Sequence, residues 1–386
     1  MTERLYYHDS YLREFAAVVV ETANNGTVAY LDRTAFYPTS GGQPFDTGSL
    51  AGVRVEEVTD EGDRIAHRLS KPLAADHVVG AIDWDRRFDH MQQHTGQHLL
   101  SAVFEERFHL RTVSFHLGQE ASTIDLEGGP VDPRIVQETE SRANAIVFEN
   151  RSVTVRYEDA AEVQGLRKAS DREGTLRIVA IEGLDNSACG GTHVRVTGEI
   201  GPILIHKLEK IRQSVRVEFL CGARAVRRAR ADYDALTKIS QLVSAPADET
   251  PGLVAAQLEN ARAAAKAQRK LEADLAAYQG RELYQATAPG ADGIRRIRRR
   301  LTTGSLDDLA ALAQSFTAQP RAVFIGALDD PPSLLYAVSE DAGIDAAAVL
   351  KSALGSVGGR GGGTARMARG SVPNRDALDQ LWETLG

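Results

Sequence analysis

The chain has 386 residues, of which 42% are hydrophobic and 25% are charged, the composition of a folded globular protein. This length predicts two or three domains rather than one. The formal net charge of −8 argues against a protein that coats nucleic acid indiscriminately, although it leaves room for a local basic surface.

The sequence pattern argues against both membrane insertion and a disulfide framework. No apolar run approaches the ~20 residues that a membrane-spanning helix needs, and residues 1–10 lack the apolar core of a signal peptide. Only two cysteines occur, Cys189 and Cys221, and the second is predicted to be a small core residue. We therefore expect a reduced, cytoplasmic protein with no membrane partner.

Residues 1–85 are predicted to form a small antiparallel β-barrel domain. Residues 15–22 and 27–31 are strand-like runs, and the Asn24-Asn25-Gly26 sequence between them is typical of a hairpin turn. Residues 53–58 alternate apolar and polar side chains, as a half-buried strand does.

Residues 86–222 are predicted to be an α+β domain. Helices are expected over residues 90–108 and 133–150, and strands over residues 122–126, 176–181, 202–208 and 215–220. The first helix carries His94 and His98, and residues four apart lie on the same face of a helix. Both imidazoles can therefore point at one ion. Two histidines four residues apart on a helix are, however, more often a half-buried pair than a metal site.

A second pair of metal-binding side chains occurs in the Cys189-Gly190-Gly191-Thr192-His193 motif. Its two glycines predict a turn in which the backbone can curl around a ligand, and imidazole nitrogens and a thiolate both suit Zn²⁺. The predicted ligands of one zinc ion per chain are His94, His98, Cys189 and His193. Four protein ligands usually make a structural zinc site, so a catalytic role requires one ligand to be loose or absent, or the coordination number of the zinc to rise.

Residues 223–285 are rich in helix-forming residues and predict two long helices. Ser244-Ala245-Pro246 and Pro251-Gly252 interrupt the run and mark the break between the helices. An apolar stripe follows the second helix, at Leu253, Leu258, Ala265, Leu271 and Leu275. We expect this stripe to pack within the chain, and the alternative is a homodimer through these C-terminal helices.

Residues 286–386 alternate short helices and strands. Buried strands are expected over residues 322–327 and 333–338, and a helix over residues 345–354. The glycine-rich residues 355–363 are not a Walker loop, because no Gly-Lys-Ser/Thr follows them. They predict either a flexible linker or a glycine-rich loop close to a phosphate backbone.

Two basic segments stand out against the acidic composition of the chain. Residues 206–230 contain eight Lys or Arg, and residues 295–300 contain five Arg. Either cluster alone is most simply a solvated helix face, but two of them in an acidic protein favour a phosphate-backbone partner.

The motifs, taken in this order, resemble a known family. Residues 35–44, which end in Gly-Gly-Gln-Pro, precede the His94-to-His98 and Cys189-to-His193 motifs as in the editing domain of alanyl-tRNA synthetase and its free-standing relatives, the AlaX proteins. The glycine-rich C-terminal stretch is similar to the DHHA1 domain that ends many of these chains. We therefore expect an α+β fold with four parts: a barrel (1–85), a zinc-binding editing domain (86–222), a helical hairpin (223–285) and an α/β DHHA1-like nucleic-acid-binding domain (286–386).

The resemblance also implies an activity. It implies a zinc-dependent hydrolase that cleaves the ester of mischarged tRNA(Ala). The expected substrate is Ser-tRNA(Ala) first and Gly-tRNA(Ala) second. Such an enzyme is physically reasonable, because a pocket built for alanine rejects an analogue that differs by one hydroxyl or one methyl by only about 10–200-fold. A synthetase needs an ATP-binding catalytic domain before its editing domain, whereas this chain reaches Gly-Gly-Gln-Pro by residue 44. We therefore expect a stand-alone, trans-acting deacylase.

Site residues follow partly from the same resemblance. The expected substrate-binding residues are Gln97, Ser114, His116, Gly41, Gly42 and Gln43. Asp185 is expected to orient a ligand histidine. The residues expected to contact tRNA are Arg295, Arg296, Arg360 and Arg366. The sequence leaves open whether zinc activates water or only positions the 3′ end of the tRNA.

Two other functions are compatible with these residues. A non-catalytic, zinc-stabilised tRNA-binding protein would also have a closed ligand set and two basic clusters. A deacylase for another mischarged tRNA, such as Ser-tRNA(Thr), would have similar motifs, because threonyl-tRNA synthetase carries a similar editing domain. The Gly-Gly-Gln-Pro segment and the DHHA1-like tail favour the alanine system.

Overall fold

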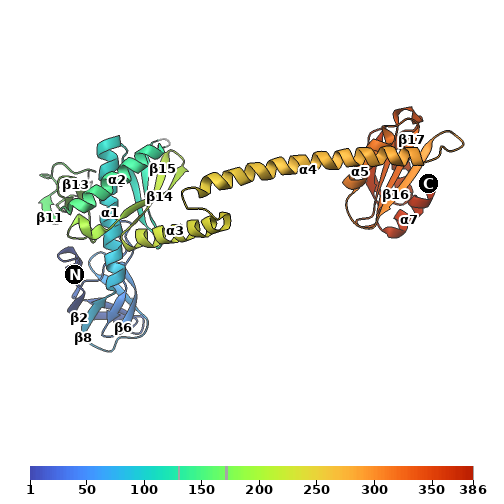
Figure 1. Ribbon diagram of the computed structural model, residues 1–386. Helices are drawn as coiled ribbons and strands as arrows, with labels where there is room; N and C mark the ends of the chain where they lie inside the picture. Colours follow the sequence, from blue (N-terminus) through green and yellow to red (C-terminus); the bar gives the residue numbers. More distant parts are fainter. Residues whose placement is uncertain (129–130, 170–172, 386) are drawn as a thin grey trace. The chain divides into compact units, whose positions relative to one another are not determined.

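The computed structural model describes residues 1–128, 131–169 and 173–385 (Figure 1). The chain divides into two compact units, Met1–Lys238 and Ile239–Gly386, and the predicted α+β class is confirmed. Among the described residues, no helix combines the length and the hydrophobicity that a bilayer span requires.

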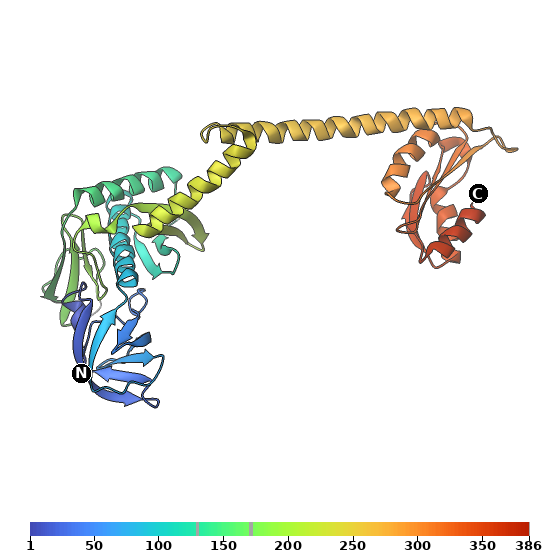
Figure 2. The ribbon, with the colours of Figure 1, turned by 60° about the horizontal axis from the view of Figure 1, so that its bottom comes forward.

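The chain begins with a closed β-barrel, as predicted. Its six strands follow the order β2-β3-β7-β6-β5-β8. They are β2 (Glu14–Ala23), β3 (Val28–Leu31), β5 (Gly48–Leu50), β6 (Val53–Asp60), β7 (Ile65–Leu69) and β8 (His77–Ile82), drawn in blue in Figure 2. The hairpin turn between β2 and β3 is confirmed, because Asn24, Asn25 and Gly26 all have positive φ there. Two further short strands, β1 (Glu3–Arg4) and β4 (Arg33–Thr34), pair in parallel as a separate two-stranded sheet.

A long helix, α1 (Trp84–Phe108), leads from the barrel into the centre of the first unit. The predicted start at residue 90 is wrong, because the Asp83 side chain accepts a hydrogen bond from the backbone N–H of Arg86 and caps the helix there. One sheet beside α1 has the order β14-β15-β10-β9 and a second has the order β11-β12-β13. Their strands, with α2 (Pro133–Glu149), are β9 (Thr112–Leu117), β10 (Ser122–Glu127), β11 (Val153–Asp159), β12 (Thr175–Ile181), β13 (Asp185–Ala188), β14 (Ile203–Ile211) and β15 (Ser214–Cys221).

Because α1 is surrounded, most of its second half is buried on every side. Gly96 in the middle of the helix is explained by this packing, since a Cβ there would lie 2.3 Å from the Sγ of Cys221. A helical glycine costs about 1 kcal/mol relative to alanine, and here it admits the end of β15. Cys221 is a fully buried free thiol, which confirms its prediction as a core residue.

A buried ion pair joins α1 to the loop that follows β4. The side chains of Arg87 and Asp46 are both 0% exposed, and Arg87 Nε lies 3.0 Å from both carboxylate oxygens of Asp46. Arg87 also donates to the backbone oxygens of Ser10 and Ala35, and Asp46 accepts from the backbone N–H of Tyr37. The loop that contains Gly-Gly-Gln-Pro is thereby fixed against the helix that carries His94.

Two long helices, α3 (Ala223–Val243) and α4 (Thr250–Ala286), follow β15. The break between them contains the predicted Ser244-Ala245-Pro246, whereas Pro251 and Gly252 lie in the first turn of α4. The leucines of the apolar stripe on α4, at 253, 258, 271 and 275, are exposed, at 39%, 56%, 68% and 56%, so the described residues of the C-terminal unit do not cover them. Packing elsewhere within the chain stays a prediction. Packing against a second copy of the chain stays a prediction.

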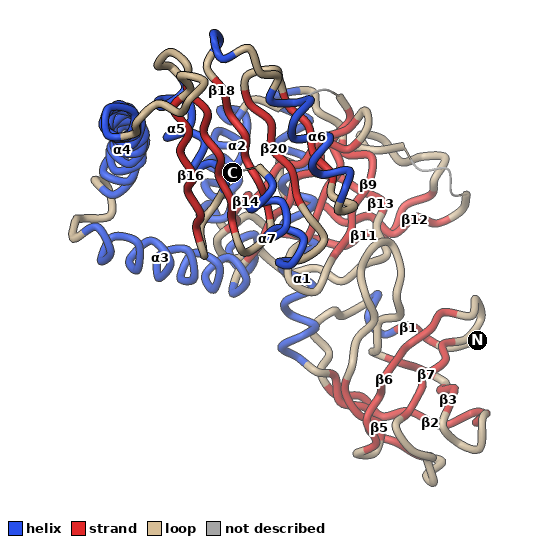
Figure 3. The backbone as a smooth tube through the Cα atoms, turned by 90° about the vertical axis from the view of Figure 1, so that its right-hand side faces the viewer, coloured by secondary structure: helices blue, strands red, loops and turns tan. Residues whose placement is uncertain are grey.

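The C-terminal unit contains a sheet of order β16-β17-β18-β20-β19, with α6 (Ala346–Ser356) and α7 (Arg375–Thr384) over the face that Figure 3 turns to the viewer. The helix α5 (Leu306–Thr317) packs against the other face. The strands are β16 (Arg295–Leu301), β17 (Ala322–Leu328), β18 (Ser333–Val338), β19 (Arg360–Gly363) and β20 (Met367–Ser371). The buried strands predicted at 322–327 and 333–338 are confirmed.

Two expectations for this unit are wrong. The five arginines at 295–300 lie on β16, which pairs in parallel with the fully buried β17, and not on a helix face. Residues 360–363 of the glycine-rich stretch are neither a flexible linker nor an open loop, because Arg360–Gly363 form an edge strand paired with β20, and their closeness to a phosphate backbone stays a prediction. A Cβ at Gly361 would lie 2.4 Å from the backbone oxygen of Arg369, so glycine is needed for this close pairing.

A buried histidine in the barrel makes the stability of the first unit depend on pH. His67 is 0% exposed, hydrogen-bonds the backbone oxygen of Ala29 through Nδ1 and the hydroxyl of Thr34 through Nε2, and burial lowers its pKa to about 4. Between its ordinary pKa of 6.5 and about 4, only the unfolded chain takes up this proton. The neutral ring therefore contributes stability that is lost as pH falls through that window, by about 3 kcal/mol.

We predict that the difference in unfolding free energy between the wild type and His67→Gln shrinks by roughly 2–3 kcal/mol from pH 7 to pH 4. Glutamine can keep both hydrogen bonds and does not titrate. Denaturant titrations at several pH values measure the difference, and a difference that stays constant across this range would contradict the prediction.

Candidate metal centre

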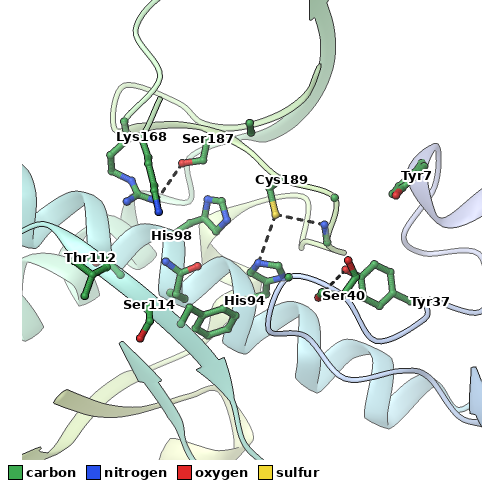
Figure 4. A pocket seen from close by; sticks show the side chains of 18 of the residues that line it. Tyr7, Tyr37, Ser40, His94, His98, Thr112, Ser114, Lys168, Ser187 and Cys189 are labelled. Carbon is green, nitrogen blue, oxygen red and sulfur yellow. Dashed lines mark hydrogen bonds between the residues drawn. The ribbon is translucent and has the colours of Figure 1, made fainter. Parts of the chain in front are cut away.

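Four predicted ligands come together in the first unit. His94 and His98 lie on α1, and Cys189 and His193 lie on the segment after β13. One ligand atom from each of the four lies within 4.8 Å of the others, so the cluster could hold a metal ion. Figure 4 shows Cys189 Sγ near His94, and the sulfur lies 3.5 Å from His94 Nε2 and 3.4 Å from His193 Nε2.

The ring of His94 is oriented by Gln43 of the Gly-Gly-Gln-Pro loop. His94 Nδ1 lies 2.9 Å from Gln43 Oε1, which also accepts the backbone N–H of Thr192 at 3.1 Å. An N–H group can bond only to the oxygen end of the amide, so His94 Nδ1 must donate its proton to Oε1. The lone pair of His94 is then on Nε2, on the side of Cys189.

The other two histidines are held in the same way. His98 Nδ1 lies 2.9 Å from a carboxylate oxygen of Asp185, the residue predicted to orient a ligand. Thr95 gives its only hydroxyl proton to the backbone oxygen of Met91, so it accepts from His193 Nδ1 at 3.1 Å. The Nδ1 atom of each ring is therefore held by an acceptor, so Nε2 is the nitrogen that each ring can offer to a metal ion.

The charges of the cluster favour a thiolate at Cys189. Although burial alone would raise it, the pKa of the Cys189 thiol is held well below its usual range by the neighbouring His94 and His193. Burial opposes a charge on His98 as well, but the hydrogen bond to Asp185 raises its pKa to about 9. Burial and His94 lower the pKa of His193 to about 3. A thiolate is the form of cysteine that a metal ion binds, so the direction of this shift suits a ligand role for Cys189.

The glycine pair of the second motif allows the close approach of His94. A Cβ at Gly191 would lie 2.2 Å from His94 Cε1 and 3.0 Å from Gln43 Oε1. Any side chain at this position would push the ring out of place. The Arg177 guanidinium also holds the segment, since it donates to the backbone oxygens of Cys189 and Gly191 at 2.7 and 3.0 Å.

A cavity of about 450 Å³ opens over the cluster, and His94, His98 and Cys189 form part of its wall. Figure 4 shows Thr112, Ser114, Lys168 and Ser187 around it. Three of the predicted substrate-binding residues line it, namely Gly41, Gln97 and Ser114. Its remaining wall includes hydroxyl groups and the cations of Arg4, Arg167 and Lys168.

The other three predicted substrate-binding residues lie elsewhere. Gln43 is 0% exposed and lies behind His94 instead of facing the cavity. Gly42 packs the loop on β9, because a Cβ there would lie 2.8 Å from the backbone oxygen of Phe115. His116 is exposed on β9 and is not part of the cavity wall that the described residues form.

Two cavity residues are fixed as hydrogen-bond acceptors. Ser114 donates its hydroxyl proton to Asp125 at 2.6 Å, and Arg216 beside that carboxyl holds its pKa below the usual range. Gln97 Nε2 donates to Ser101 Oγ at 2.9 Å, and among the described residues no partner is found for its amide oxygen. Both side chains can therefore accept a hydrogen bond from a ligand.

The four arginines predicted to contact tRNA differ in their surroundings. Arg295 donates to the backbone oxygen of Thr287, and Arg296 pairs with Asp292 at 2.6 Å. Arg366 pairs with Glu340 at 2.9 Å. Arg360 is exposed on the edge strand β19. Three of the four thus already have partners within the chain.

Sequence reasoning missed several residues that shape the centre. Thr95 and Thr192 lie inside the two motifs, and their hydroxyls could have been examined as partners of the ligand histidines. Arg167, which contacts Asp185 at 2.7 Å, and Asp125, which contacts Ser114, carry no local sequence signal.

Comparisons with known proteins agree with this architecture. The family model for the threonyl and alanyl tRNA synthetase second additional domain matches residues 176–217, and the DHHA1 domain model matches residues 294–386. A solved structure of the C-Ala domain of Aquifex aeolicus alanyl-tRNA synthetase aligns with 24% of this chain and 87% of its own, at 20% identity and a TM-score of 0.22, too low to add to the argument.

Curated relatives extend the similarity over the whole chain. The alanyl-tRNA editing protein AlaX-M of Methanosarcina mazei is 38% identical over 56% of this chain and 94% of its own length. AlaX-L of Pyrococcus horikoshii is 28% identical over 96% of this chain and 95% of its own length. The alanine–tRNA ligase of Pyrococcus abyssi is 32% identical, and this chain spans 43% of that ligase.

The matched domains and the His/Cys cluster define a class, in which a synthetase-type additional domain is joined to a DHHA1 domain. Within it, the chain belongs to the alanyl-tRNA editing protein family, AlaX.

We predict that Gln43→Ala weakens the binding of Co²⁺, used as a spectroscopic probe of the cluster, by about 10–100-fold. The reason is that His94 loses the acceptor that fixes its ring. Competition with a chelator, followed by the cobalt–thiolate absorbance, measures the affinity of the full chain.

Gln97→Ala is the matched control for this experiment. Gln97 lies between the two ligand histidines, but its side chain bonds Ser101 and contacts neither Nδ1 atom. We expect its Co²⁺ affinity to equal that of the wild type, and equal affinity for Gln43→Ala would contradict the role given to Gln43.

Proposed function

We propose that this chain is a zinc-dependent, trans-acting deacylase that hydrolyses the ester of mischarged tRNA(Ala), with Ser-tRNA(Ala) as the first substrate and Gly-tRNA(Ala) as the second. One observation carries the proposal: three histidines, each held at Nδ1, come together with one cysteine, and His94, His98 and Cys189 of this cluster line a polar cavity. The names of the relatives AlaX-L and AlaX-M support the alanyl-tRNA system.

The donor set fits zinc. Neutral imidazoles and a thiolate in a group of four are ligands that tetrahedral Zn²⁺ takes in proteins. The residues that would hold the ion are His94, His98, Cys189 and His193. Three second contacts, from Gln43, Asp185 and Thr95, support the set because each fixes the tautomer of one ring.

A zinc ion at this position supplies Lewis-acid polarisation of an ester carbonyl. The chain's own residues bind and orient the rest of the substrate. Lys168 places positive charge at the cavity wall, where the phosphates of an RNA 3′ end are attracted, whereas Arg4 and Arg167 at this wall are paired with Asp60 and Asp185. Arg167 is also tied to Asp185 and Ser187, at 2.7 and 3.1 Å, so it links that wall to the partner of His98.

The discrimination between serine and alanine rests on the two fixed acceptors. Ser114 and Gln97 have each given a proton to another side chain, so a serine hydroxyl or the substrate ammonium group can donate to them. A site built to hydrogen-bond a hydroxyl rejects an analogue that lacks it by ~10⁴-fold or more, because the polar groups are left unpaired. This discrimination factor is far larger than the one that a pocket for alanine reaches by selecting on size alone.

Four protein ligands fill the coordination of a tetrahedral zinc ion, so a substrate can reach the ion if one ligand dissociates. The position of Cys189 favours it as this labile ligand. Cys189 is only partly buried and lines the cavity, whereas His193 is 4% exposed and held by Thr95. A set of three histidines is itself a complete ligand set for catalytic zinc. We therefore assign His94, His98 and His193 to holding the ion and Cys189 to the labile position.

The proposed activity predicts selective ester cleavage. Full-length protein with stoichiometric zinc is expected to deacylate Ser-tRNA(Ala) fastest and to spare Ala-tRNA(Ala), with serine favoured over alanine by a factor on the order of 10⁴. Gly-tRNA(Ala) is expected to be cleaved more slowly than Ser-tRNA(Ala), because glycine has no hydroxyl to donate to Ser114 or Gln97. Release of labelled amino acid measures the rates, with Ser-tRNA(Thr) as the test of the other synthetase system.

Three outcomes would contradict the proposal. Inertness toward every charged tRNA together with tight RNA binding would indicate a non-catalytic binding protein. Preference for Ser-tRNA(Thr) would assign the chain to another tRNA. Equal cleavage with and without metal would remove zinc from the reaction.

The assignment of the labile ligand predicts different results for two variants. Cys189→Ala is expected to keep zinc on its three histidines while the deacylation rate falls at least ~100-fold, and His193→Ala is expected to lose zinc and activity together. Metal analysis of purified protein and deacylation kinetics measure the two properties. Cys221→Ala, which removes the other thiol, is expected to keep both, and joint loss of zinc and activity in Cys189→Ala would make that cysteine a structural ligand.

A further inference from the structure

A second cavity, of about 880 Å³, lies in the first unit and shares no lining residue with the cavity over the metal ligands. Four segments line it: the end of the Gly-Gly-Gln-Pro loop, the first turns of α1, the turn between β9 and β10, and the start of α3. The residues that face it from these segments include Phe45, Trp84, His90, Gln119 and Arg227.

Aromatic rings form part of the wall of this second cavity. The rings of Trp84 and Phe88 lie with their centroids 5.6 Å apart, and Phe45 reaches the same cavity from the loop. The guanidinium of Arg13 lies over the Trp84 ring at 4.1 Å, and that of Arg86 lies over the Phe45 ring at 5.6 Å, so arginines already lie against these rings. All three rings are only partly buried, so part of each is accessible to a planar ligand.

Cations lie next to these rings. Arg86, Arg224 and Arg227 line the cavity against the two carboxylates of Asp85 and Asp89. Arg224 is bound to Asp89 through its Nε at 2.9 Å and a second nitrogen at 2.6 Å, which neutralises that carboxylate. Arg227 is exposed, and no ion pair or hydrogen bond of its side chain occurs among the described residues. It is therefore available to a ligand phosphate.

A buried histidine adds an unsatisfied polar group. His90 lines the cavity, is 3% exposed, and its Nδ1 has no hydrogen-bond partner among the described residues. Burial and the nearby Arg86 and Arg224 lower its pKa to about 3, so the ring is neutral. A neutral imidazole has one donor and one acceptor, a pattern that can pair with the edge of a nucleobase.

We propose that this second cavity binds one unpaired nucleotide of an RNA, with the base against Trp84, Phe45 and Phe88 and its phosphate near Arg227. Aromatic faces combined with arginines are the usual means of holding single-stranded nucleic acid. The inference deepens the proposed function, on which it rests for the identity of the substrate as an aminoacylated RNA.

The position of the cavity indicates which nucleotide it takes. Gly41 lines the cavity over the metal ligands and Pro44 lines the second cavity, so the Gly-Gly-Gln-Pro loop forms part of the wall of both cavities. Three residues of chain span at most ~11 Å. An RNA whose aminoacylated 3′ end enters the first cavity therefore places a nucleotide close to that end within reach of the second.

Tryptophan fluorescence can report on this cavity directly. The chain has two tryptophans, so Trp382→Phe leaves Trp84 as the only one. In that background, a hairpin RNA with the acceptor-stem sequence of tRNA(Ala) and a single-stranded 3′ end is expected to quench the fluorescence of Trp84, and the quenching is expected to saturate as the RNA concentration rises. The same hairpin without its single-stranded nucleotides, and inorganic phosphate, are expected to leave the fluorescence unchanged.

Substitutions identify the residues responsible. Arg227→Gln and Phe45→Ala, each in the Trp382→Phe background, are expected to raise the Kd for the hairpin with the single-stranded 3′ end on the order of 10-fold. Arg228→Gln is the matched control, because Arg228 is the next residue on α3, pairs with Asp232 at 3.0 Å and does not line the cavity. Its Kd is expected to equal that of the unsubstituted background.

Several results would overturn the inference. One is that the hairpin with the single-stranded 3′ end causes no quenching, and another is that the blunt hairpin quenches Trp84 equally well. A third is that Arg227→Gln and Arg228→Gln change the Kd by the same factor. A lower Kd for free AMP than for the RNA would assign the cavity to a mononucleotide. Deacylation measured on the same samples separates this inference from the proposed function. Ester cleavage without Trp84 quenching sinks the cavity proposal alone, and quenching without cleavage sinks the proposed activity and keeps the RNA site.

Discussion

The candidate metal centre depends on one constraint, which is that each of its three histidines is held at Nδ1 by a single acceptor. A neutral imidazole has only one N–H, so a fixed proton at Nδ1 leaves the lone pair at Nε2. Gln43, Asp185 and Thr95 supply the acceptors, and the three Nε2 atoms are thereby committed to the side of Cys189. Without these contacts, the same four side chains could be near one another and still not be arranged to hold an ion.

The acceptors come from separate parts of the chain, which makes the centre a joint product of the barrel and the α+β region. Gln43 belongs to the loop that follows β4, and its position relative to α1 is set by the buried Arg87–Asp46 pair. Removing one partner of such a pair leaves an uncompensated buried charge and costs about 3–5 kcal/mol. The Gly-Gly-Gln-Pro loop thus acts through Gln43 on a metal ligand, through Gly41 on the first cavity and through Phe45 on the second.

Local patterns carried much of the sequence-based prediction. The spacing of His94 and His98, the glycine pair before His193 and the Asn-Asn-Gly hairpin each depend on a few neighbouring residues, and the structure has them as expected. Expectations that depended on distant partners were less accurate. The arginines at 295–300 lie on a strand because β17 beside them is buried, and Arg360–Gly363 form an edge strand because β20 pairs with them. Gln43 was expected at the substrate, yet only the fold brings it to His94.

Zinc X-ray absorption spectroscopy of the purified full-length chain tests the central claim most directly, because it counts the ligands of the bound ion. The account predicts one zinc per chain with imidazole nitrogens at about 2.0–2.1 Å and one sulfur at about 2.3 Å. A spectrum without sulfur, a spectrum dominated by oxygen ligands, or protein that holds no stoichiometric metal would contradict it.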